Sequence, residues 1–193
     1  MTAPPLAIIQ ARMGSQRFKG KMMAPLAGHP LIYWSWRRSV EAFGEANVVV
    51  AIPAIKNFPE NEPLKAFLDR IGALVFEWGG PENDVLGRYY FCSHTYRWSP
   101  DAVICRVTPD DPLKDPKLMQ AVAAGARHPV ELSCEATTLQ SLTILHFGVT
   151  DPEQREHLSL ILSPVMPPAP PKGVWSVDCE EDLQAIHAKM EGK

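Results

Sequence analysis

Short apolar runs alternate with longer segments of helical spacing along the chain up to residue 126. Apolar runs that are bounded by polar loops and rich in β-branched residues are typical of buried strands, and they occupy residues 6–10, 47–52, 73–78 and 101–108. Between these runs, apolar residues recur at helical spacing in residues 30–42, 60–72, 82–98 and 115–126. The alternation predicts an α/β protein with a mainly parallel sheet and helices on both of its faces.

Local capping signals support the expected helix ends. Asn83 or Asp84 suits the N-cap of the helix at 82–98, and Asp115 suits that of the helix at 115–126, because short polar side chains accept hydrogen bonds from the free backbone N–H groups. Pro116 fits the first helical position of the same helix. Gly72 is expected to close the helix at 60–72.

The pattern is less regular after residue 126. We expect a strand at 142–147, a short helix at 151–163, a returning strand at 173–178 and a closing helix at 180–190. The five prolines of residues 164–172 predict a stiff, extended connector. We treat residues 1–193 as a single domain.

Composition narrows the class of protein. Hydrophobic residues make up 46% of the chain and charged residues 21%, as in ordinary globular proteins. The net charge of −3 argues against the broad basic surface that nucleic acids require. The sequence contains neither a basic leader nor an apolar stretch of about 18 residues, so we expect no signal peptide and no membrane span. The cysteines form no C-x-x-C pair, which argues against a zinc knuckle. A cytoplasmic enzyme or binding protein fits best.

The loop after the first predicted strand concentrates positive charge. Glycine lets the backbone approach an anion closely, arginine supplies planar paired donors, and lysine supplies a mobile charge. The loop therefore suits a polyphosphate, although a solvated basic loop would have the same composition. Its cations and small residues are Arg12, Gly14, Ser15, Arg17, Lys19, Gly20 and Lys21.

Carboxylates follow two other predicted strands. Asp110 and Asp111 come after the strand at 101–108, and Asp178 ends the strand expected at 173–178. Because the carboxyl ends of parallel strands meet at one edge of a sheet, Asp110 and Asp178 are expected to lie together, facing the basic loop. Such a set would suit Mg²⁺ bound to a nucleoside triphosphate. Taken singly, Asp110 also fits a turn and Asp178 a helix N-cap.

The motifs at these positions resemble those of a known family. "ARMGSQRFKGK", "PENDVLGRYY", "RVTPDDPLKDP", "REH" and "VDCEEDLQAI" occur in the order expected of cytidylyltransferase-like proteins. These include the spore-coat polysaccharide cytidylyltransferases, which are related to the CMP-sialic acid and CMP-KDO synthetases. The resemblance covers nearly all of residues 6–122 and returns at about 153–187.

The resemblance implies a fold and an activity. The fold is that of the nucleotide-diphospho-sugar transferases, a Rossmann-like, GT-A-like α/β/α sandwich around a mainly parallel mixed sheet. The activity is transfer of CMP from CTP to an acidic sugar, with Mg²⁺ as cofactor and pyrophosphate as the second product, in the synthesis of a surface polysaccharide or glycan.

The resemblance also assigns roles to individual residues. It places Arg12, Lys21 and Asp110 in catalysis and gives Asp110 and Asp178 to the metal. The histidine of its R-E-H motif is His157, for which a place on a helix face or at an interface is an equal alternative to catalysis. The residues that it assigns to the nucleotide are Ala11, Arg12, Gly14, Ser15, Arg17, Lys21, Asp84 and Arg88.

Two departures from the family pattern leave a second reading open. Pro109 replaces the usual glycine before the metal aspartate, and the segment between about 127 and 172, which in the family helps to bind the sugar and form a dimer, is shortened. The chain could therefore be a catalytically impaired homologue that serves as a nucleotide- or sugar-binding module. The sequence leaves the acceptor sugar, the choice of cytosine over other bases, and homodimer formation open.

Overall fold

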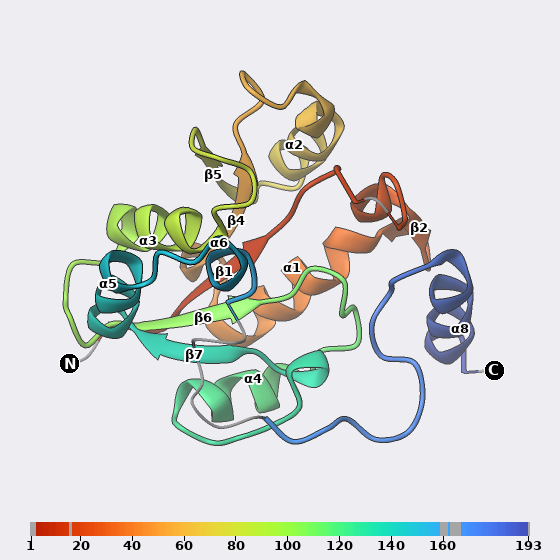
Figure 1. The fold of residues 1–193 in the computed structure, drawn as a ribbon. Coiled ribbons are helices and arrows are strands. Elements are labelled where there is room, and N and C mark those ends of the chain that lie inside the picture. Colours follow the sequence, from red (N-terminus) through yellow and green to blue (C-terminus); the bar gives the residue numbers. More distant parts are fainter. Residues whose placement is uncertain (1–2, 16, 159–161, 163–166, 193) are drawn as a thin grey trace.

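The computed structural model describes residues 3–15, 17–158, 162 and 167–192. Its centre is a five-stranded sheet with the strand order β5-β4-β1-β6-β7 (Figure 1). The first four strands of that order run parallel, whereas β7 runs antiparallel to β6. The strands are β1 (Leu6–Gln10), β4 (Val48–Pro53), β5 (Leu74–Trp78), β6 (Val103–Val107) and β7 (Glu135–Thr138).

The predicted mainly parallel sheet is confirmed, and its central strands are buried on both faces. β4 consists entirely of buried residues, and Leu6–Ile9 of β1 are 0% exposed. Because successive side chains of a strand point to opposite faces, Ala7 and Ile9 enter one half of the core while Leu6 and Ile8 enter the other. A run that is apolar at every position is the expected consequence of this double burial.

Helices cover both faces of the sheet. The core half around Ala7 and Ile9 is completed by α1, α2, α4 and α8, and the half around Leu6 and Ile8 by α3 and α5. The short α6 packs on α3, and a small hairpin of β2 (Pro25–Leu26) and β3 (His29–Pro30) precedes α1. The helices are α1 (Leu31–Phe43), α2 (Glu62–Arg70), α3 (Val85–Tyr96), α4 (Pro116–Ala123), α5 (Leu139–Gly148), α6 (Pro152–Glu156) and α8 (Glu180–Met190).

The predicted helix caps are confirmed. The Asp84 side chain accepts a hydrogen bond from the backbone N–H of Gly87 at the start of α3. The Asp115 side chain accepts one from the backbone N–H of Lys117 at the start of α4, where Pro116 occupies the first helical position. Within the part of the chain that the structure describes, no helix is long and apolar enough to cross a membrane.

Two predictions for the second half of the chain are wrong. Residues 142–147 belong to α5, a helix that Thr138 begins by accepting a hydrogen bond from the backbone N–H of Ser141. A short apolar run fits a helix or a strand equally well, and here the cap and the packing on α3 decide for the helix. The antiparallel strand in this region, β7, is not among the expected strands.

The strand expected at 173–178 is also absent. In its place lies an irregular segment, in which the backbone N–H of Val177 donates a 2.9 Å hydrogen bond to the carbonyl oxygen of Asp110. In the proline-rich connector, residues 167–171 have no regular structure, and 164–166 lie outside the described residues. The short helix expected at 151–163 is present as α6, while 159–161 and 163 also lie outside the described part.

A buried ion pair fixes the loop that follows β6. Lys114 is 1% exposed, and its ammonium group lies 3.1 Å from Oδ2 of Asp111, which is 3% exposed. The same ammonium donates hydrogen bonds to Oγ1 of Thr108 and to the carbonyl oxygen of Val130. Of these three partners of the ammonium only Asp111 carries a negative charge, so the burial of the Lys114 charge is compensated only while Asp111 remains in place.

We expect Asp111→Ala to lower the free energy of unfolding by about 3–5 kcal/mol, because it leaves the ammonium of Lys114 buried and uncompensated. Urea denaturation would measure the loss. The nearby Asp115→Ala, which removes only an exposed N-cap, should cost about 1 kcal/mol. Equal losses for the two variants would contradict this account of the pair.

Candidate active site

A cavity of about 730 Å³ opens at the carboxyl ends of β1 and β6, where ligands bind in open parallel sheets. It lies between the loop after β1, the start of α3, the loop after β6 and the end of α6. Of the residues predicted for a site, it is lined by Ala11, Arg12, Gly14, Ser15, Arg17, Lys21, Arg88, Asp110 and also His157. Its further polar lining residues are Gln10, Glu82, Asn83, Arg106, Thr108 and Glu156.

The basic loop is folded back on itself by backbone contacts. Gly20 adopts φ +72°, a left-handed conformation that glycine accepts without strain, and its N–H donates to the carbonyl oxygen of Met13. The buried Asn61 accepts a hydrogen bond from the N–H of Met13. A Cβ on Gly14 would lie 3.1 Å from Oε1 of Glu82, so a side chain at this position would require the Glu82 carboxylate to shift by a few tenths of an ångström.

Lys21 connects the loop to both predicted metal carboxylates. Its ammonium donates 2.8 Å hydrogen bonds to Oδ2 of Asp110 and to the carbonyl oxygen of Val177, and it lies 3.8 Å from Oδ1 of Asp178. Arg17 lies 3.1 Å from the same oxygen of Asp178. Asp110 and Asp178 thus meet beside the basic loop as predicted, although Asp178 is not on a strand and does not line the cavity.

Arg12 extends across the mouth of the cavity to acidic groups that the sequence reading did not single out. Its guanidinium donates a 2.9 Å hydrogen bond to Oδ1 of Asn83 and lies 3.4 Å from Glu156 and 3.7 Å from Glu82. Glu82 lies within the motif PENDVLGRYY and Glu156 is the central residue of R-E-H, but their role as partners of Arg12 depends on how distant segments fold together.

Asp84 and Arg88 have different surroundings, although both were assigned to the nucleotide. Asp84 does not line the cavity: besides capping α3, its carboxylate lies 2.9 Å from Nε of Arg155, which anchors α6. Arg88 does line the cavity and is 1% exposed, with its guanidinium donating to the carbonyl oxygen of Glu82. Burial lowers the pKa of Arg88 to about 10, so the side chain stays charged at neutral pH.

Arg106 is a further cation in the wall of the cavity. It is paired in register with Glu135 of β7, and its guanidinium donates a hydrogen bond to the Glu135 carboxylate. Burial alone would lower the pKa of Arg106, but the surrounding Tyr89, Glu135 and Asp110 raise it above its usual value. Arg106 is the first residue of the motif RVTPDDPLKDP, but nothing in the sequence indicated that it would pair with Glu135.

The carboxylates suit a metal ion that is shared with a phosphate. No group of three or more His, Cys, Asp or Glu side chains suited to a metal occurs among the described residues. Mg²⁺ in phosphate-transfer sites is commonly held by one or two carboxylates together with oxygen atoms of the substrate. Asp110 and Asp178 supply this donor set, so the residues fit a Mg²⁺ ion that arrives with a nucleotide.

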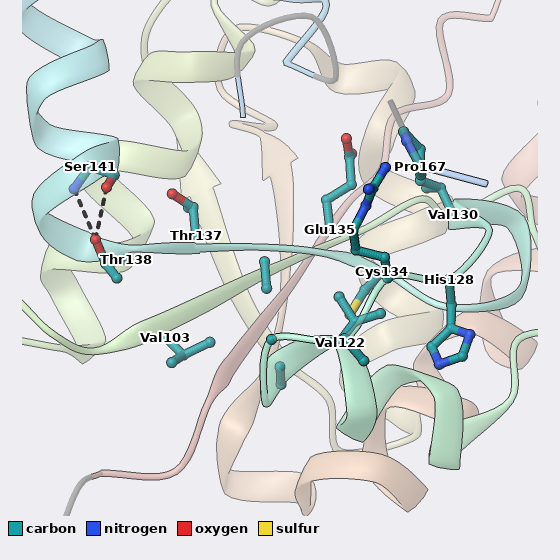
Figure 2. A pocket seen from close by; sticks show the side chains of 15 residues that line it. Val103, Val122, His128, Val130, Cys134, Glu135, Thr137, Thr138, Ser141 and Pro167 are labelled. Atoms are coloured by element: carbon teal, nitrogen blue, oxygen red, sulfur yellow. Dashed lines mark hydrogen bonds between the residues drawn. The ribbon is translucent and has the colours of Figure 1, made fainter. Parts of the chain in front are cut away.

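A second cavity, of about 440 Å³, lies along β7 (Figure 2). Val122 and His128 lie on one side of this strand, whereas Glu135 and Thr137 point to the other. The same Glu135 that lines this cavity pairs with Arg106 in the wall of the first. Near the far end of β7, Thr138 is hydrogen-bonded to Ser141 of α5.

Curated proteins of similar sequence are sugar cytidylyltransferases. The 3-deoxy-manno-octulosonate cytidylyltransferase of Tolumonas auensis is 30% identical over 118 residues, which are 61% of this chain and 43% of that protein. The 8-amino-3,8-dideoxy-manno-octulosonate cytidylyltransferase of Shewanella sp. (strain ANA-3) is 29% identical over 125 residues, 64% of this chain and 48% of that protein. The chain thus spans about half the length of these curated relatives.

Solved structures confirm the predicted nucleotide-diphospho-sugar transferase fold. A cytidylyltransferase from Leptospira borgpetersenii superposes with a TM-score of 0.82 at 22% identity, covering 98% of this chain and 87% of that one. A CMP:2-keto-3-deoxy-manno-octonic acid synthetase complexed with CTP superposes with a TM-score of 0.67 at 17% identity, covering 98% and 99%.

The sequence profile of one protein family, described as cytidylyltransferase, matches residues 6–135. This range begins with β1 and ends at the first residue of β7, so it includes the basic loop, Arg88 and Asp110. The match extends over more than half of the chain, and it agrees with the resemblance that the motifs indicated. The chain belongs to the cytidylyltransferase family.

Proposed function

We propose that the protein transfers CMP from CTP to an acidic sugar and releases pyrophosphate. The observation that carries this proposal is the convergence of Arg12, Arg17 and Lys21 with Asp110 around one cavity at the carboxyl edge of the sheet. The two curated relatives support an acidic sugar as acceptor, since both are cytidylyltransferases of octulosonates. We propose that the acceptor sugar binds in the same cavity.

The basic loop would bind the triphosphate. Each of its three cations in the cavity has a carboxylate partner: Arg12 lies near Glu82 and Glu156, Arg17 near Asp178, and Lys21 near Asp110. Arg17 is 76% exposed at its side chain, so its ion pair is weak and exchangeable. Phosphate oxygens of CTP can replace these carboxylates as partners and so place the α-phosphorus near Asp110.

Lys21 would have the most constrained role. Its side chain is only 10% exposed, and the carbonyl oxygen of Val177 holds its ammonium in place independently of either carboxylate. A cation fixed in this way stabilises the negative charge that develops as pyrophosphate departs, without reorganising during the reaction. A Mg²⁺ ion held by Asp110 and Asp178 would supply further charge neutralisation at the phosphates.

A pyrophosphate-release assay tests the activity directly. The purified protein is incubated with Mg²⁺, one of the four ribonucleoside triphosphates, and a panel of acidic and neutral sugars that includes 3-deoxy-manno-octulosonate. We expect release that requires CTP and an acidic sugar. CTP binding by calorimetry without turnover on any sugar would instead support the alternative of an impaired homologue that only binds nucleotide. Pro109 and the shortened segment between about 127 and 172 favour this alternative.

We expect Asp110→Asn to lower kcat by about 100- to 1000-fold, by analogy with the loss of one charge-stabilising donor elsewhere. Asparagine keeps the size of the side chain but removes the negative charge that would hold the metal. The asparagine side chain can still accept the hydrogen bond from Lys21, but the lost charge should lower the melting temperature, so turnover is measured well below the melting temperature of the variant. Asp101→Asn, on the exposed loop before β6, serves as the control. Parental turnover in Asp110→Asn would rule out the metal role.

For Asp84→Asn, the geometry predicts a loss of stability rather than of nucleotide binding. Asparagine can still cap α3, but it loses the ion pair with Arg155, so we expect the free energy of unfolding to fall by about 1–3 kcal/mol. The KM for CTP should change less than twofold. A large rise in the KM for CTP with unchanged stability would instead support the direct nucleotide contact implied by the family resemblance.

A further inference from the structure

Arg106 lies on β6, between the parallel strand β1 and the antiparallel strand β7. It is in register with Ile8 of β1 on one side and Glu135 of β7 on the other. Its neighbour Ile104, two positions earlier on the same face of β6, packs in the core half covered by α3 and α5. Arg106 therefore projects from the α3 side of the sheet at the edge where the parallel strands end, and its side chain lines the large cavity.

The hydrogen-bonding capacity of this guanidinium is only partly used. One terminal nitrogen donates to Glu135, while the buried Nε has no hydrogen-bond partner among the residues that the structure describes. The carboxylate of Glu135 also lacks a hydrogen bond, because its Oε1 is buried and has no partner among the described residues. Buried polar atoms without partners are rare in folded proteins, and a bound ligand is one reason for keeping them.

The position of Arg106 differs from that of the basic loop. Arg12, Arg17 and Lys21 come from the loop after β1, whereas Arg106 comes from the next strand of the sheet and lies beside its edge strand. Asp110 accepts a hydrogen bond from Lys21 of the basic loop and lines the same cavity as Arg106. The cavity thus has, on its β6 side, a cation that does not belong to the basic loop.

We propose that Arg106 binds the carboxylate of the acceptor sugar and that Glu135 orients its guanidinium for this contact. This inference rests on the proposed function. Arginine suits a carboxylate because adjacent N–H groups of its planar fork can donate to both oxygens at once. Arg106 would then select acidic over neutral acceptors, and Glu135 would keep the cation in position while the site is empty.

The experiment uses a double substitution, Arg106→Gln with Glu135→Gln. Removing Arg106 alone would leave the Glu135 carboxylate buried and unpaired, which would destabilise the fold for reasons unrelated to the acceptor. The double variant removes both charges and keeps the two amide groups in hydrogen-bonding range. The probes are 3-deoxy-manno-octulosonate and its methyl ester, which lacks the negative charge. Pyrophosphate release gives separate KM values for CTP and acceptor.

We expect the parent to prefer the acid over the ester, and the double variant to raise the KM for the acid roughly tenfold to a hundredfold, as the loss of a hydrogen bond to a charged group would. Its KM for the ester and for CTP should change less than about twofold. The single variant Glu135→Gln keeps the cation but loses the carboxylate that orients it, so its KM for the acid should rise by less than in the double variant, while part of the preference for the acid is retained.

Arg97→Gln is the matched control. Arg97 also has a buried Nε without a partner in the described chain, but its guanidinium contacts Asn47 and backbone carbonyls far from the cavity lining. It should shift the melting temperature without changing either acceptor KM. A double variant that keeps the parental KM for the acid and the parental preference over the ester would show that Arg106 is only structural.

A binding measurement distinguishes a failure of the proposed function from a failure of the role proposed for Arg106. If the parent turns over no acceptor, calorimetric titration of 3-deoxy-manno-octulosonate into the protein with CTP and Mg²⁺ replaces the kinetic reading. Binding to the parent but not to the double variant would support the role of Arg106. Equal binding to both proteins, or no binding to the parent, would overturn it.

Discussion

The ammonium group of Lys21 joins three segments that are far apart in the sequence. It belongs to the loop after β1, and it bonds to Asp110 after β6 and to the backbone carbonyl of Val177 before α8. A nearly buried ammonium requires such partners, because an unpaired charge at this depth would be strongly unfavourable. The irregular segment before α8 therefore has to return to the sheet edge, and this return brings Asp178 beside Arg17.

The position of the basic loop and of Asp110 at one edge of the sheet could be foreseen from the sequence. Short apolar runs predict the strands β1, β4, β5 and β6. The rule that ligands bind at the carboxyl ends of parallel strands then places the basic loop and Asp110 together. The acidic partners of Arg12 could not be foreseen, because Glu82 and Glu156 reach it only through tertiary packing. Asp178 was placed correctly for a wrong reason, since the strand expected there is absent.

The region after residue 126 was harder to predict for a physical reason. The apolar run at 142–147 carries no turn residues, and in such a run only the cap at Thr138 and the packing against α3 distinguish a helix from a strand. β7 is four residues long and includes the charged Glu135, which a hydrophobic pattern does not recognise as part of a buried strand. Its burial depends on Arg106, which lies opposite in the register.

The antiparallel direction of β7 determines which stretches of the chain can be altered without touching the site. In the parallel strands, the loops that follow a strand reach the cavity. In β7 the order is reversed: its first residue, Glu135, lies at the cavity edge, and its last, Thr138, lies at the opposite edge beside Val103. Natural variation or engineered insertions directly before Glu135 would therefore reshape the β7 side of the cavity, whereas insertions directly after Thr138, at the start of α5, would fall at the opposite edge of the sheet.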